Sequence, residues 1–169
     1  MPASRNLILD HAQAMRKIRR IAYEIYEQNF EENEVVFIGV HQTGFLFAQT
    51  LQQEVKKIAP FKTALFELKI NKQEPVNSAI ELAAGADLLA NKVLVLTDDV
   101  LNTGSTLVYS MRPLLDIAIK KLQLAVMVDR EHRSFPVSPD FVGYALSTTV
   151  NQHIEVSINE GGEIAVYLD

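Results

Sequence analysis

The chain has 169 residues, a net charge of −5 and no cysteine, and 48% of its residues are hydrophobic. This length fits a single domain over residues 1–169 that can bury a sizeable core. The lack of cysteine excludes disulfides and thiolate metal sites, and it is compatible with a reducing cytosol. The acidic balance argues against a broad nucleic-acid surface and leaves room only for a local basic patch.

The N-terminal segment shows no sign of export. Residues 1–10 have neither a long apolar core nor a small-residue cleavage site, so we expect no secretion signal. No apolar run in the chain approaches the length that a membrane-spanning helix needs. Together with the lack of cysteine, these features predict a cytoplasmic protein without membrane contact.

The first element predicted along the chain is an amphipathic helix. Asp10 followed by Gln13 is typical of an N-cap whose third helical residue reaches back to it. Apolar residues then recur at helical spacing, at Ile18, Ile21, Ala22, Ile25 and Tyr26. The run Val35–Val40 predicts a short strand that leads into the turn 41–44 and a second amphipathic helix.

The middle of the chain combines two strands with an irregular segment. Residues Thr63–Ile70 can form a strand. The segment Asn71–Asn91 is polar and then alanine-rich, and we interpret it as a mobile loop. Val93–Leu96 is a continuous apolar run, which is typical of a buried parallel strand.

The last part of the chain predicts one helix and several strands. A helix is expected over Thr106–Ile119, interrupted by Pro113. Strands are expected at Leu122–Val128, Phe141–Ala145, Ile154–Ile158 and Ile164–Leu168. The last two flank a hairpin turn over residues 159–162. Strands that alternate with helices indicate an α/β fold, with a mainly parallel twisted sheet flanked by helices and an antiparallel C-terminal hairpin.

The most informative segment joins the strand Val93–Leu96 to the helix that follows it. Two adjacent carboxylates, Asp98 and Asp99, precede a turn made of Asn102, Thr103, Gly104, Ser105 and Thr106. Such a turn can direct backbone amides and hydroxyls at an anion, and the helix dipole favours that anion. Carboxylates beside a phosphate site would repel the ligand unless they bind sugar hydroxyls or a divalent cation. The segment therefore predicts a site for a phosphorylated sugar with magnesium; alternatively, the acids only cap the strand and the turn only starts the helix.

The same segment resembles the phosphoribosyl pyrophosphate signature of the type I phosphoribosyltransferases. The runs Val128–Arg133 and Pro139–Gly143 are similar to the base-binding region of the PyrR group, and Arg20–Ile25 and Ile38–Val40 resemble that group too. PyrR proteins are pyrimidine-operon attenuation regulators that also have uracil phosphoribosyltransferase activity. The resemblance covers nearly the whole chain and implies the type I phosphoribosyltransferase fold, with a small hood around residues 71–84.

The resemblance implies transfer of ribose 5-phosphate from phosphoribosyl pyrophosphate to a nucleobase. Asp98 and Asp99 would hold the ribose hydroxyls and Mg²⁺, directly or through water. The turn 102–106 would bind the 5′-phosphate. The pyrophosphate would bind to backbone amides of a second turn, which consists of His41, Gln42, Thr43 and Gly44.

The resemblance also implies positions for the base. Phe141 would lie against it, and backbone groups near Val142 would read its polar edge, a mode of recognition that rejects analogues leaving those groups unpaired. Arg130 follows a core strand and could meet the pyrophosphate or pair with a nearby carboxylate. We expect a homo-oligomer, a dimer or larger.

The chain departs from the PyrR pattern in both turns. PyrR proteins usually carry a basic residue and an arginine where this chain has His41 and Gln42, and a tyrosine and an arginine where it has Asn102 and Ser105. Purine salvage enzymes place an aspartate at the position of Asn102, as a proton acceptor from the purine. Because a neutral amide cannot accept that proton, uracil is the expected base.

Two other interpretations are open at this stage. The cluster Arg16, Lys17, Arg19 and Arg20 allows an RNA-contacting patch, as in a PyrR-like regulator that senses nucleotides without turnover. The solvated face of an amphipathic helix explains the same cluster and is favoured. A phospho-acceptor receiver domain would need a phosphorylatable aspartate on another strand and a later lysine, and neither is evident.

Overall fold

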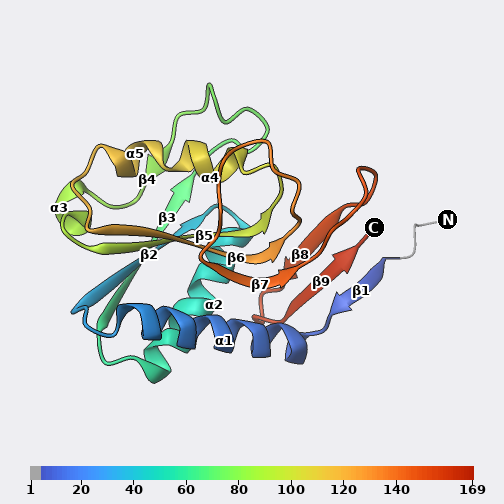
Figure 1. The fold of residues 1–169 in the computed structure, drawn as a ribbon, viewed down its shortest axis with the longest axis horizontal. Helices are drawn as coiled ribbons and strands as arrows, with labels where there is room; N and C mark the ends of the chain where they lie inside the picture. The colour runs from blue at the N-terminus through green and yellow to red at the C-terminus, as the bar shows by residue number, and fades with distance from the viewer. Residues whose placement is uncertain (1–4) are drawn as a thin grey trace.

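A computed structural model describes residues 5–169 of the chain, and its main element is a six-stranded sheet (Figure 1). The strand order is β4-β3-β2-β5-β6-β7. The strands are β2 (Glu34–Val40), β3 (Lys62–Lys69), β4 (Glu81–Leu82), β5 (Val93–Leu101), β6 (Lys121–Asp129) and β7 (Phe141–Ala145). Neighbouring strands run parallel except β3 and β4, so the predicted mainly parallel α/β sheet is confirmed.

Helices cover both faces of this sheet (Figure 1). One face carries α1 (His11–Asn29) and α2 (Thr43–Ile58), and the other carries α3 (Ala86–Leu89), α4 (Ser105–Ser110) and α5 (Arg112–Leu115). Successive residues of a strand point to opposite faces, so the apolar central strands feed two cores. Val93 and Val95 pack on the side of α1 and α2, whereas Leu94 and Leu96 pack on the side of α3 to α5.

The first helix forms as its sequence predicts. The Asp10 carboxylate accepts a hydrogen bond from the Gln13 backbone N–H at 2.8 Å, and the Gln13 side chain accepts one from the Asp10 N–H at 2.9 Å. This capping box satisfies two backbone donors that a helix start otherwise leaves unpaired. The apolar stripe that includes Ile18, Ile21 and Ile25 is fully buried against the sheet.

A second, three-stranded antiparallel sheet lies beside the main one and has the order β1-β9-β8. Its strands are β1 (Asn6–Leu9), β8 (Ile154–Ile158) and β9 (Ile164–Leu168). The predicted hairpin is thereby confirmed, but it forms its own sheet instead of extending the main one. β1 was not predicted, because four residues that pair only with the far end of the chain carry little local signal. Ile154 and Ile164 join the core beneath α1 and α2, so the two sheets share that core.

Three predicted elements have different bounds in the structure. The strand predicted over Val93–Leu96 continues to Leu101, because residues 97–101 keep pairing with β6. The helix expected over Thr106–Ile119 is broken after Ser110, and Pro113 lies in the first turn of α5, where its missing N–H costs no hydrogen bond. The segment Asn71–Asn91, expected to be a loop throughout, contains β4 and α3. Within residues 5–169, no helix is long and apolar enough to cross a membrane.

Candidate active site

A cavity of about 440 Å³ lies where the central strands of the main sheet end. Ligands of open α/β sheets bind at this carboxyl edge. The cavity is lined by Thr43, Lys72, Asp98, Asp99, Val100, Asn102, Thr103, Ser105, Thr106, His153, Ile154, Glu155 and Val156. The structure therefore brings together the predicted acid pair, most of the turn 102–106 and one residue of the turn 41–44.

The acid pair lies inside β5, not in the turn after it. The side chain of Asp98 is 4% exposed and that of Asp99 is 20% exposed. The Asp98 carboxylate accepts a hydrogen bond from the Asp99 backbone N–H at 2.9 Å. The ammonium of Lys72 lies 2.8 Å from Asp98 Oδ1 and 3.4 Å from Asp99 Oδ1. One cation from the segment after β3 thus faces both carboxylates.

Burial and charge shift the pKa values of this cluster. Burial raises the pKa of Asp98 well above its ordinary value, repulsion from the neighbouring Asp99 carboxylate raises it further, and the ammonium of Lys72 opposes both effects. Burial by itself would lower the pKa of Lys72, but the attraction of Asp98 and Asp99 outweighs it, so the pKa of Lys72 is raised. A charged Asp98 therefore needs a cation beside it, and Lys72 provides one.

The turn 102–106 is folded around a small hollow of about 40 Å³ that Asp98 also lines. Gly104 has a φ of +90°, a conformation that favours glycine, and it caps the start of α4. From outside, the backbone N–H groups of Ser134 and Phe135 donate to the Thr103 carbonyl at 2.9 and 3.0 Å. These two hydrogen bonds hold the turn in place, and Asp98 lines the hollow on its inner side.

The turn 41–44 packs directly against the acid pair. A Cβ atom on Gly44 would lie 2.7 Å from Asp98 Oδ1 and 3.1 Å from Asp98 Cα, so only glycine fits without displacement. The Thr97 hydroxyl donates to the carbonyls of Ile38 and Gly44, at 3.3 Å each. The side chain of His41 pairs through Nδ1 with Glu67 of β3. Gln42 is exposed, and only Thr43 of this turn lines the cavity.

Arg130 has structural partners in place of the expected pyrophosphate contact. Its guanidinium donates to the Thr148 hydroxyl, to the carbonyls of Thr149 and Gln152, and more weakly to Asn102 Oδ1 at 3.4 Å. Four of its five N–H donors are satisfied in this way. Arg130 therefore ties the loop between β7 and β8 to the turn 102–106.

The expected base contacts at Phe141 and Val142 also need correction. Phe141 is fully buried in the core between the sheet and α1, because its side chain points to that face of β7. The carbonyls of Val142 and Gly143 accept hydrogen bonds from Arg20 at 2.9 and 2.8 Å. Neither residue lines the cavity.

The structure adds cavity residues that the sequence did not single out. Lys72 comes from the segment expected to form the hood, Ile154 is the first residue of β8, and His153 directly precedes it. No spacing distinguishes Lys72 among the 16 lysines and arginines of the chain. Its role depends on a contact across 26 positions of sequence, which local patterns do not encode.

The donor set of the cavity is suited to a magnesium ion that arrives with a substrate. Within residues 5–169, no cluster of three or more histidine and acidic side chains could hold a metal by itself. Mg²⁺ is usually bound by one or two carboxylates together with substrate phosphates and water. The carboxylates of Asp98 and Asp99 meet that requirement next to the turn 102–106.

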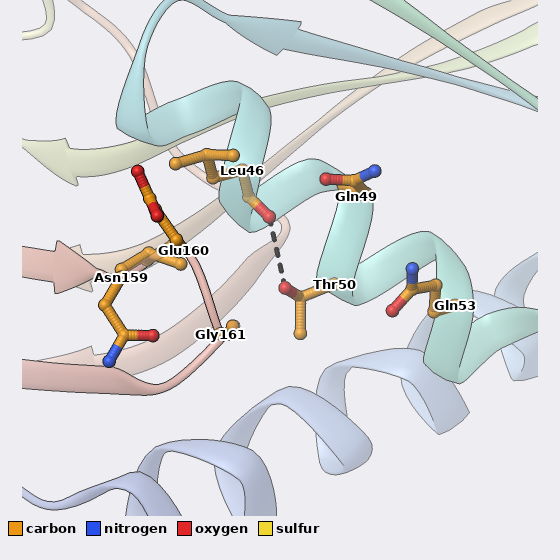
Figure 2. Close-up of a pocket in the computed structure, with 9 residues that line it drawn as sticks. Leu46, Gln49, Thr50, Gln53, Asn159, Glu160 and Gly161 are labelled. Atoms are coloured by element: carbon orange, nitrogen blue, oxygen red, sulfur yellow. Dashed lines mark hydrogen bonds between the residues drawn. The ribbon is translucent and has the colours of Figure 1, made fainter.

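A second cavity, of about 410 Å³, lies between α2 and the turn that joins β8 to β9 (Figure 2). Gln49, Thr50 and Gln53 of α2 face the turn 159–162 across it. The Thr50 hydroxyl is already paired, because it donates to the Leu46 carbonyl at 3.1 Å. The residues that line this cavity include neither the acid pair nor any residue of the turn 102–106, so it is not the candidate site.

The fold, with an acid pair and a hydroxyl-rich turn at the carboxyl edge of the sheet, is that of the type I phosphoribosyltransferases. Residues 4–160 match the family model "Phosphoribosyl transferase domain", and the chain belongs to this family. Among solved structures, the hypoxanthine phosphoribosyltransferase of Trypanosoma cruzi superposes with a TM-score of 0.77 at 16% identity, over 95% of each chain. At that identity the likeness shows the fold alone.

Curated relatives place the chain more narrowly, in the PyrR group. "Bifunctional protein PyrR 1" of Lactiplantibacillus plantarum is 34% identical over 162 residues, which cover 90% of each protein. "Bifunctional protein PyrR" of Brevibacillus brevis is 32% identical over 164 residues, covering 93% of this chain and 92% of the relative. The predicted family and group are therefore confirmed.

Proposed function

We propose that the chain transfers ribose 5-phosphate from phosphoribosyl pyrophosphate to uracil and releases pyrophosphate. One observation supports this most: a single cavity joins the acid pair, the turn 102–106 and Thr43 of the turn 41–44. A matching ligand carries neighbouring hydroxyl groups between two anionic groups. Phosphoribosyl pyrophosphate has this arrangement, with its ribose hydroxyls between a 5′-phosphate and a pyrophosphate.

Each part of the cavity has a role in this proposal. Asp98 and Asp99 accept hydrogen bonds from the ribose hydroxyls and would hold Mg²⁺, directly or through water. The turn 102–106 binds the 5′-phosphate through backbone N–H groups and hydroxyls. The turn 41–44 binds the pyrophosphate through backbone amides. When bound, Mg²⁺ supplies positive charge that neutralises the departing pyrophosphate.

The chemistry needs no covalent nucleophile from the protein. The bond between the ribose C1 and the pyrophosphate oxygen breaks as the base nitrogen bonds to C1, and the proton on that nitrogen passes to water or to the departing pyrophosphate. C1 passes through an oxocarbenium-like state, so the two turns contribute by fixing both ends of the sugar phosphate. Catalysis then depends on positioning and on electrostatic stabilisation.

The base is proposed to lie against the apolar part of the cavity, formed by Val100 and Ile154. Asn102 also lines the cavity, and its neutral amide can donate and accept hydrogen bonds but cannot take a proton from a purine. The lack of the aspartate that purine salvage enzymes carry at this position supports uracil over a 6-oxopurine. The corrected positions of Phe141 and Val142 do not enter the proposal.

The test compares kcat/KM for uracil, hypoxanthine and guanine, with phosphoribosyl pyrophosphate and Mg²⁺ in each assay. We expect uracil to be preferred. A preference of about tenfold for either purine, which corresponds to roughly 1.4 kcal/mol of transition-state discrimination, would overturn the choice of base. It would leave the transferase assignment intact.

A further inference from the structure

Lys72 is held over the acid pair by the segment that follows β3. Ile70, two residues earlier, is buried in the core on the side of α3 to α5. Asn71 then fixes the local backbone, because its N–H donates to the Ser78 hydroxyl at 2.8 Å and its side chain accepts from the Gln73 N–H at 3.0 Å. The backbone just before Lys72 is therefore ordered, and only the Lys72 side chain needs to move if its ammonium leaves the carboxylates.

The contact joins a displaceable cation to a buried anion. The Lys72 ammonium is 2.8 Å from Asp98 Oδ1 and 3.4 Å from Asp99 Oδ1. Its side chain remains 37% exposed, whereas that of Asp98 is 4% exposed. Solvent thus reaches the Lys72 ammonium and weakens its attraction to the carboxylates. The buried Asp98 carboxylate, in contrast, is not hydrated by bulk water.

We propose that Lys72 is an internal counter-ion that keeps divalent metal ions off the acid pair until a sugar phosphate displaces it. A metal ion bound by both carboxylates would lie within a few ångströms of the ammonium, and two cations so close repel strongly in a partly buried site. Two carboxylates also supply too few oxygens for Mg²⁺, which completes its shell with substrate phosphates and water. Metal and sugar phosphate therefore enter together, and Lys72 leaves as they arrive.

This inference rests on the proposed function for the identity of the sugar phosphate, but the competition between Lys72 and metal can be measured without it. The experiment titrates Mn²⁺ into the full chain without any sugar phosphate and follows bound metal by electron paramagnetic resonance. Lys72→Met removes the charge and keeps the length of the side chain. Lys72→Gln is a second neutral variant, Lys72→Arg keeps the charge, and Lys69→Met removes a nearby exposed lysine at the end of β3.

We expect Lys72→Met and Lys72→Gln to bind Mn²⁺ about tenfold more tightly than the wild type, or more. Lys72→Arg and Lys69→Met should bind it as weakly as the wild type. The gain should vanish when Asp99→Asn is added to Lys72→Met, because the metal then loses one of its carboxylates. Thermal unfolding of each variant checks that the fold is kept.

Three outcomes would overturn the inference. Unchanged Mn²⁺ affinity in both neutral variants would show that Lys72 does not exclude metal. A gain in Lys72→Arg equal to that in Lys72→Met would show that charge is not the cause. A gain that survives Asp99→Asn would place the metal elsewhere. If the predicted gain is found but no base accepts ribose 5-phosphate, the proposed function fails and the counter-ion role stands.

Discussion

Gly44→Ala is a small change that should separate fold from function at the candidate site. The added Cβ would lie 2.7 Å from Asp98 Oδ1, 3.1 Å from Asp98 Cα and 3.4 Å from the Thr97 carbonyl oxygen. Two of these atoms belong to the backbone of β5, which pairs with β2 and β6 and cannot move easily. The turn 41–44 must therefore shift away from the acid pair.

The cost of that shift can be estimated from its size. Overpacking of this kind costs about 1–3 kcal/mol of unfolding free energy. For a domain of this length, each kcal/mol corresponds to roughly 2–4 °C in Tm. A displacement of about 1 Å between groups that position a substrate can lower the rate about 100-fold. We expect kcat/KM for phosphoribosyl pyrophosphate to fall by about that factor, far more than the loss of stability explains at a temperature where the variant is folded.

The assay measures pyrophosphate release and thermal unfolding for the wild type, Gly44→Ala and Gly161→Ala. Gly161 lies in the exposed turn between β8 and β9, where an added Cβ would meet only Asn159 Oδ1, at an ordinary distance of 3.4 Å. Gly161→Ala should change neither the rate of pyrophosphate release nor the Tm. Wild-type kcat/KM in a folded Gly44→Ala protein would refute the claim that the turn 41–44 and the acid pair work as one site.

Two further predictions concern charge. Because the pKa of Asp98 is raised, the folded chain keeps a proton that the unfolded chain has lost, so stability falls as pH rises from the ordinary value of 3.8 toward the raised pKa. The Tm of Asp98→Asn minus the Tm of the wild type should therefore increase as pH rises through this range. A decrease in this difference would contradict a raised pKa of Asp98. On α1, Arg19 pairs with Glu54 at 3.4 Å, Arg20 binds two carbonyls within β7, and Lys17 lies over the Tyr144 ring. RNA binding needs several free cations, so a labelled pyrimidine-leader hairpin should bind only weakly at physiological ionic strength, with or without uridine monophosphate. A submicromolar complex that weakens in Arg16→Ala and Arg19→Ala would favour a regulator instead.

The sequence predicted the features that depend on local pattern. The capping box at Asp10 and Gln13, the hairpin around residues 159–162 and the apolar start of β5 all follow from short-range rules. The order of acid pair and turn also follows, since both come from one continuous segment. The acid pair and the turn 102–106 were expected to lie near the turn 41–44, because the carboxyl ends of parallel strands meet at the same edge of a sheet.

The features that the sequence did not predict depend on tertiary contacts. β5 continues through Asp98 and Asp99 although aspartate is disfavoured in strands, because pairing with β6 outweighs that preference. Phe141 was placed against the base, but the alternation of β7 turns its side chain into the core. Lys72 reaches the acid pair from a segment whose path no short-range pattern defines.

The central claim is that Asp98 and Asp99, with the turn beside them, hold the ribose of phosphoribosyl pyrophosphate. The most direct measurement is pyrophosphate release with uracil and Mg²⁺ by the wild type, by the double variant Asp98→Asn and Asp99→Asn, and by Asp116→Asn, which changes an exposed aspartate after α5. We predict that release is abolished in the double variant while its unfolding transition remains cooperative, and that it is unchanged in Asp116→Asn. Near-normal release by the folded double variant would contradict the account.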